Sequence, residues 1–159
     1  MKLLPPIHRR LSALLCGLCA ALGLVHAPAA QAALGGSLGS VQADELQLHA
    51  VRRVASRSGF ELHTLTLASG TQVREFVDAS GTVFGVAWSG PLMPDLNQVL
   101  GRHFTRLVAR SQQPHADHRL LQLQADDLVI VSGGRMRNFA GRAYLPLRVP
   151  AGVTPAQIQ

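Results

Sequence analysis

The sequence predicts an α+β domain in which one main amphipathic helix packs on one face of an antiparallel sheet of about six strands. Three short runs rich in Thr, Val, Phe and Leu, separated by turn residues, precede a segment whose apolar residues recur at helical spacing. About three further strand-like runs follow that segment. The order βββ-α-βββ is typical of a sheet with its helix on one side, which places the fold in the α+β class.

The first 32 residues have the three zones of a signal peptide. Lys2, Arg9 and Arg10 are positive, residues 11–25 are uncharged and mostly apolar, and Ala30-Gln31-Ala32 supplies a small-x-small cleavage pattern. The apolar run is about 15 residues long, whereas a helix needs about 20 to span a bilayer. We therefore expect cleavage after Ala32, a periplasmic or extracellular location, and no stable membrane span in the mature chain.

Export changes the composition of the working protein. Both cysteines, Cys16 and Cys19, lie in the removed segment, so the mature chain has no disulfide and no thiol chemistry. From residue 33 onward the chain has twelve arginines, no lysine and nine acidic residues, a net charge of +3. This weak excess does not indicate a nucleic-acid partner, and it leaves the oligomeric state open.

The mature chain is expected to form a single domain. Residues 33–40 are small and flexible and are interpreted as a linker, and residues 41–159 as the α+β domain. Residues 41–54 are interpreted as a helix, although Leu46, Leu48 and Ala50 also alternate as they would in a strand.

The three central strands are expected at residues 62–67, 71–77 and 82–88. A three-residue loop ending in Gly70 sets Leu65 opposite Val73 and Leu62 opposite Phe76, which keeps apolar residues on common faces. The same reasoning at Gly81 sets Val77 opposite Val83, Phe76 opposite Phe84 and Arg74 opposite Val86, and it places Trp88 on the face of Phe76 and Phe84.

The main helix is expected to follow Asp95, which has the position and side chain of an N-cap. The helix buries an apolar stripe comprising Leu96, Val99, Leu100, His103, Phe104, Leu107 and Val108. Later strands are expected at residues 119–125, 128–132 and 143–147, and Pro146 makes the last one an edge strand or a strand end.

Two parts of the sequence resemble a known family. They are the string VREF…VFGVAWSGP…PDL over residues 73–96, and the tail containing Ser132-Gly133-Gly134-Arg135-Met136 and Gly141-Arg142-Ala143-Tyr144-Leu145-Pro146. Together they resemble a family of exported proteins from Gram-negative bacteria catalogued as domain of unknown function 2844. The resemblance covers nearly all of the mature chain. It implies export and a single domain, and it implies no reaction and no site residues.

Two groups of residues are candidates for binding a ligand or partner. Trp88 and Arg74 could form an aromatic platform for a sugar or peptide, although a packing role suits Trp88 as well. A Gly-rich bend gathers Arg135, Arg137, Arg142 and Tyr144, which could hold a phosphate or a carboxylate of an envelope polymer. Arginines in such a bend also serve solubility and pair with nearby acids such as Asp126 and Asp127.

The leading hypothesis is an exported, non-enzymatic binding domain whose partner is an envelope protein or an anionic polymer. The alternative is a small envelope hydrolase or lyase that uses Glu75, Asp95 or His103 with an arginine. Glu75 is expected on the aliphatic face opposite Gly85, as a buried acid or as half of a structural ion pair. No cofactor motif is present, and the spacing of His115, Asp117 and His118 does not match a known metal site.

Overall fold

The computed structural model describes residues 34–114 and 120–159 and contains a seven-stranded antiparallel sheet. The strand order is β1-β2-β3-β4-β7-β6-β5. Strands β1 to β4 form one half of the sheet and β5 to β7 the other, and the halves join where β4 pairs with β7. The strands are β1 (Val51–Arg57), β2 (Phe60–Thr66), β3 (Gln72–Val77), β4 (Val83–Gly90), β5 (Leu120–Ala125), β6 (Leu128–Arg135) and β7 (Asn138–Tyr144).

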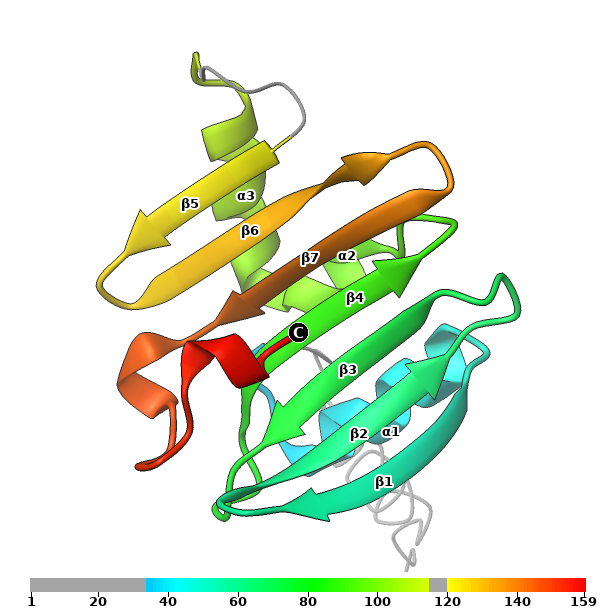
Figure 1. The fold of residues 1–159 in the computed structure, drawn as a ribbon, viewed down its shortest axis with the longest axis vertical. Coiled ribbons are helices and arrows are strands. Elements are labelled where there is room, and N and C mark those ends of the chain that lie inside the picture. The colour runs from blue at the N-terminus through cyan, green and yellow to red at the C-terminus, as the bar shows by residue number, and fades with distance from the viewer. Residues whose placement is uncertain (1–33, 115–119) are drawn as a thin grey trace, which may run out of the picture.

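Helices cover one face of this sheet and the C-terminal segment covers part of the other (Figure 1). The helices are α1 (Leu38–Gln47), α2 (Leu96–Leu100), the 3-10 turn η1 (Gly101–His103) and α3 (Phe104–Ser111). The C-terminal segment contains two short 3-10 turns, η2 (Pro146–Arg148) and η3 (Pro155–Gln157). We call these two surfaces the helix face and the open face of the sheet.

The core has two parts, one on each face. The larger cluster lies between the sheet and the helices and includes Leu65, Val73, Val86, Trp88, Val99 and Leu100. The smaller cluster lies under the C-terminal segment and includes Phe60, Phe76, Phe84 and Ile158. Part of the open face, beyond the C-terminal segment, is left without a covering element (Figure 1).

The α+β class and the helix-on-sheet arrangement are confirmed, with seven strands in place of about six. The additional strand is β1, which occupies part of the range 41–54 interpreted as a helix. The helix α1 ends at Gln47, and His49 turns the chain with a φ of 48°. Strand β1 then pairs with β2 over its whole length, from Val51 opposite Thr66 to Arg57 opposite Phe60. Backbone pairing with β2 therefore makes this part of the segment a strand and not a helix.

The expected register of the β2–β3 hairpin is confirmed, with Leu65 opposite Val73 and Leu62 opposite Phe76. The β3–β4 register is correct only at Val77 opposite Val83, because an irregularity follows between Phe76 and Val77. One additional residue in β4 at this bulge shifts all later pairs by one.

The shift changes the partners and the face of several side chains. Arg74 therefore lies opposite Ala87, and Glu75 lies opposite Val86. Trp88 moves from the expected aromatic face to the helix face, where it joins the larger core cluster.

The main helix begins as expected but is divided. Asp95 caps α2, because its carboxylate accepts hydrogen bonds from the backbone N–H groups of Asn97 (2.9 Å) and Gln98 (3.3 Å). Gly101, with a φ of 52°, interrupts the helix before α3.

The last expected strand, 143–147, is also displaced. Strand β7 ends at Tyr144, and Pro146 opens η2. Since β7 lies between β4 and β6, it is a central strand and not an edge strand.

Residues 34–40, expected as a linker, pack on the domain. Leu34 is 3% exposed, and Gly35 donates a backbone hydrogen bond to Val83 (2.8 Å) while Val83 donates one to Gly36 (2.9 Å). The expected signal peptide, 1–32, lies outside the described residues. Within residues 34–114 and 120–159, no helix is both long and apolar enough to cross a membrane.

Candidate functional site

The open face carries a groove of about 420 Å³ where it is not covered by the C-terminal segment. Strands β4, β7 and β6 form its floor with small residues, because Gly133 and Ala140 place little or no side chain there. The residues around it are Arg74, Trp88, Ser89, Leu120, Val131, Gly133, Gly134, Ala140, Gly141, Arg142 and Gln159. None of these has a carboxylate side chain, so the two arginines give the groove a positive charge.

Arg74 is a half-buried cation without an ionic partner among the described residues. Its Nη2 donates a hydrogen bond to Ser89 Oγ at 3.0 Å, but its buried Nε has no hydrogen-bond partner. Burial lowers the pKa of the Arg74 guanidinium, which shows that the charged form is poorly solvated here. A buried charge is costly unless it is paired, so an anion in the groove would compensate it.

Arg142 is the second cation of the groove. In the sheet register, Ala87 lies between Arg74 on β3 and Arg142 on β7, so both arginines extend from the same face. Arg142 Nη1 donates a hydrogen bond to the backbone carbonyl of Pro155 at 3.1 Å, which holds the side chain in place. The guanidinium has five N–H donors, so most of them remain for a ligand.

The structure brings together only part of the residue set expected from the sequence. Trp88 adjoins the groove, but its indole is 1% exposed and packs among helix-face residues, so it forms no aromatic platform. Arg135 and Arg137 lie exposed at the β6–β7 hairpin, outside the lining of the groove. Tyr144 packs against the aromatic cluster under the C-terminal segment.

A second unusual feature is a pair of buried carboxyl groups on the helix face. Asp44 of α1 and Glu75 of β3 are both 0% exposed and close enough for each to shift the pKa of the other. Asp44 Oδ2 and both Glu75 oxygens have no hydrogen-bond partner in the described part of the chain, while Gln98 donates its amide to Asp44 Oδ1. Since neither oxygen of Glu75 has a donor, Glu75 is the carboxyl group that we expect to hold a proton.

The pKa values of the pair follow from this environment. Burial raises the pKa of Glu75 well above its ordinary value, and the neighbouring Asp44 raises it further. Burial also raises the pKa of Asp44, although the hydrogen bonds from Glu75 and Gln98 act in the opposite direction. Glu75 was predicted from the sequence as a candidate buried acid, whereas Asp44 had no local signal beyond its place in a segment interpreted as a helix.

A buried histidine lies on the strand next to Glu75. His63, 2% exposed, lies opposite Glu75 in the register, and its Nδ1 is 3.4 Å from Arg52 Nη1. Since arginine can only donate, Nδ1 accepts and the ring proton lies on Nε2, which is 3.4 Å from Glu61. Burial lowers the pKa of His63, so the ring is neutral at pH 7.

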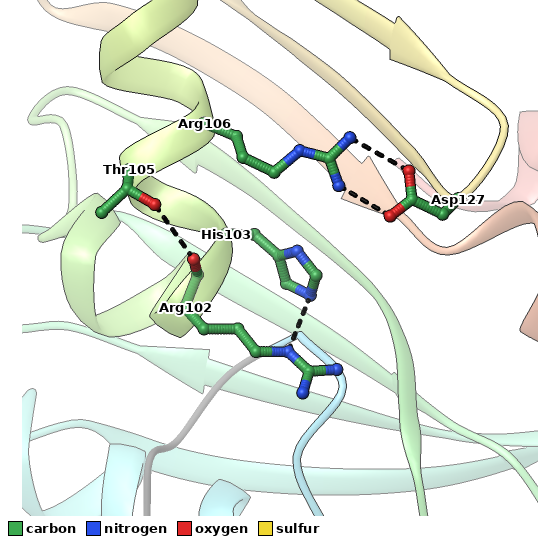
Figure 2. A network of polar contacts seen from close by, with 5 residues as sticks. All are labelled: Arg102, His103, Thr105, Arg106 and Asp127. Carbon is green, nitrogen blue, oxygen red and sulfur yellow. Dashed lines mark hydrogen bonds and ion pairs between the residues drawn. The ribbon is translucent and has the colours of Figure 1, made fainter.

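The three acid–base candidates, Glu75, Asp95 and His103, have different local roles. Asp95 caps α2 at the surface and Glu75 is enclosed with Asp44. His103 is 7% exposed at the end of the 3-10 turn η1, with Arg102 Nε donating to its Nε2 at 3.4 Å (Figure 2).

The surroundings of His103 hold α3 against the sheet. Arg106 forms a bidentate pair with Asp127 at 2.7 and 3.0 Å, which joins α3 to the β5–β6 turn (Figure 2). This pair occupies both oxygens of the carboxylate beside His103. Burial, and then the charges of Arg102 and Arg106, lower the pKa of His103. The geometry of this network is that of a packing contact between α3 and the sheet. The cleft beside it has a volume of only about 170 Å³.

Residues 34–114 and 120–159 contain no group of three or more His, Cys, Asp or Glu side chains that could hold a metal ion. The segment containing His115, Asp117 and His118 lies outside the described residues.

One comparison with known proteins found a matching family. A family model described as "Protein of unknown function (DUF2844)" matches residues 30–158, which is nearly the whole domain and includes both arginines of the groove. The comparisons with curated proteins and with solved structures found no match.

Proposed function

The chain belongs to the DUF2844 family, and we propose that this member is an exported binding domain whose groove at Arg74 and Arg142 holds an anionic group of its partner. The single observation that carries the proposal is the state of Arg74, which is half buried and, among the described residues, has no ionic partner and no acceptor for its Nε. A carboxylate or phosphate placed against this guanidinium would supply the missing charge and the missing acceptor.

The shape and composition of the groove support binding over catalysis. Its lining offers hydroxyl, amide and guanidinium donors and small apolar residues, but no carboxylate, histidine or cysteine side chain. The groups capable of acid–base chemistry, Glu75 and His103, belong to the helix side of the molecule, where they are buried. The hydrolase or lyase alternative requires Glu75, Asp95 or His103 beside an arginine that can hold a substrate. Of the three, His103 shares a cleft with arginines, Arg102 and Arg148, but that cleft has a volume of only about 170 Å³.

Export rests on the N-terminal sequence pattern. The charged start, the short apolar run and the cleavage pattern at residues 30–32 support removal of a signal peptide. The folded domain begins close behind that point, because Leu34 is already buried against the helix–sheet interface. Outside the cytoplasm, the partner would be an envelope protein or an anionic polymer.

Binding of a singly charged uronic-acid disaccharide to variants of the groove tests the proposal. We expect Arg74→Gln and Arg142→Gln each to lower the affinity by about tenfold, since a charge-assisted hydrogen bond contributes about 1.5–3 kcal/mol. Arg57→Gln is the matched control, because Arg57 is an exposed arginine on the same face but away from the groove. Equal affinities for the groove variants and the control would exclude the groove as the site.

A further inference from the structure

A third arginine is aligned with the two in the groove. The strand register places Arg53 of β1 opposite Thr64, Thr64 opposite Arg74, Arg74 opposite Ala87, and Ala87 opposite Arg142. Directly opposed residues in a sheet point to the same face. Arg53, Arg74 and Arg142 therefore form a single row across the open face, with one arginine on every second strand, and we call it the arginine row.

The spacing of the arginine row follows from sheet geometry. Neighbouring strands lie about 4.8 Å apart, so successive arginines of the row have backbones about 10 Å apart. The twist of the sheet makes the row curve without breaking it. Such a spacing suits a polymer that presents an anionic group about once per disaccharide length. A single small anion could contact at most two neighbouring arginines of the row.

The charges of the open face are segregated by sign. The charged residues of β1, β2, β3, β4 and β7 that alternate to this face are all arginines, namely Arg53, Arg57, Arg74 and Arg142. The two acidic residues of these strands, Glu61 and Glu75, alternate to the helix face, where Glu61 lies opposite the helix-side core residue Val77. The remaining described acids belong to helices, caps or turns. An anionic chain crossing this face would therefore meet no repelling acidic side chain of the described strands along the arginine row.

The residues between the arginines favour a sugar chain over a nucleic acid. Proteins that bind single-stranded nucleic acids on a sheet stack the bases on exposed aromatic side chains. Here the intervening positions are Thr64 and the buried Ala87. The phenylalanines of this face, Phe60, Phe76 and Phe84, are at most 8% exposed, and the partly buried Tyr144 packs against them. Thr64 offers a hydroxyl that suits the hydroxyl groups of a sugar.

An acidic peptide is a weaker fit to the same surface. Extended peptides commonly bind sheets by adding a strand along an edge, parallel or antiparallel to the existing strands. The arginine row runs across the strands, so a peptide added at the edge strand β1 would meet only Arg53 of the row and would not reach Arg74 or Arg142.

We infer that the arginine row binds a linear acidic polysaccharide laid across the strands, with Arg53 as a contact beyond the groove. This inference rests on the proposed function, because the groove supplies two of the three cations. The guanidinium groups would pair with carboxylates through parallel N–H···O bonds.

Hyaluronan fragments, which have one carboxylate per disaccharide, test the row directly. The disaccharide reports the groove alone, and the hexasaccharide with three carboxylates reports the row. We expect Arg53→Gln to lower the affinity for the hexasaccharide by about three- to fivefold, the upper part of the range for an exposed ion pair, and to leave the disaccharide affinity unchanged. Arg74→Gln should weaken both ligands. Arg57→Gln removes the same charge from the same strand and face, four residues from Arg53, and should change neither.

The outcomes separate the two proposals. If the disaccharide binds and depends on Arg74, but the hexasaccharide binds no more tightly or is insensitive to Arg53, the row is excluded and the groove remains. If neither ligand depends on Arg74, both proposals fail. A single-stranded oligonucleotide of equal charge that binds more tightly than the hexasaccharide would also overturn the inference. Unchanged fluorescence of the single tryptophan, Trp88, controls for folding of each variant.

Discussion

Replacing Glu75 by glutamine tests the buried carboxyl pair, because the pair makes the stability of the fold depend on pH. The pKa of Glu75 is raised in the folded chain, whereas the unfolded chain titrates near the ordinary value of 4.5. Between these two pKa values the folded chain therefore holds one proton that the unfolded chain has lost. The stabilising contribution is fully present below pH 4.5 and is lost as the pH rises through the folded pKa.

The magnitude follows from the proton count. Between the two pKa values, the additional proton of the folded state lowers the free energy of unfolding by about 1.4 kcal/mol per pH unit. Glu75→Gln removes this loss, and the new amide can donate a hydrogen bond to the neighbouring Asp44. Because the new amide also leaves polar atoms unpaired, we expect a net stabilisation of about 1–3 kcal/mol at pH 7.

The assay is urea unfolding followed by the fluorescence of Trp88, which is the single tryptophan and is 1% exposed. The useful window is pH 6.5–7.5. His63 and His103, whose pKa values are lowered by burial, make stability rise with pH only up to about 6.5. Within the window we expect the wild-type stability to fall with pH and the Glu75→Gln stability to remain flat.

Glu61→Gln is the control, since it removes a half-exposed carboxyl from the neighbouring strand and should keep the wild-type slope. A wild-type stability that is constant or rises between pH 6.5 and 7.5 would refute the reasoning. So would a Glu75→Gln slope equal to the wild-type slope.

Three further changes test packing, capping and export. Gly141→Ala should destabilise the domain by about 1–3 kcal/mol in urea unfolding, because its Cβ would lie 2.2 Å from Cζ2 of the buried Trp88; wild-type stability would contradict this. Asp95→Ala should cost about 1 kcal/mol by removing the α2 cap, and Asp95→Asn should restore most of it. Mass spectrometry of the exported protein should find Ala33 at the N-terminus, and an intact Met1 in the membrane fraction would overturn the assignment of a signal peptide.

Elements with strong local signals could be predicted from the sequence. Asp95 begins a helix because its side chain satisfies free N–H groups, and this requires only neighbouring residues. The β2–β3 register also followed locally, since Gly70, with a φ of 84°, fixes the turn, and only one pairing keeps Leu65 opposite Val73.

The bulge between Phe76 and Val77 had no such signal. All six residues from Val83 to Trp88 are buried, because both faces of β4 are covered, so the strand shows no alternation from which its register could be read. The sequence therefore assigned Trp88 to the wrong face. Strand β1 was not predicted, for the opposite reason. Its edge position leaves most of its residues exposed, so they show no buried face, and its pairing with β2 is what makes it a strand.

The candidate site depends on long-range topology. Arg74 and Arg142 could each be identified as a candidate, but nothing local indicates that β7 inserts between β4 and β6 and places them on either side of Ala87. Arg53 could not be placed at all while its segment was interpreted as a helix. The groove and the arginine row are consequences of strand order.

NMR of the arginine side chains tests the central claim most directly, because the Arg74 Nε–Hε group has no hydrogen-bond partner in the described structure. During titration with the uronic-acid disaccharide, we predict a large, saturable shift of the Arg74 Nε–Hε signal and a parallel shift of the Arg142 signal. The Arg57 signal should not move. Shifts of equal size at all three arginines, or none at Arg74 at saturating ligand, would contradict the account of an anion-binding groove.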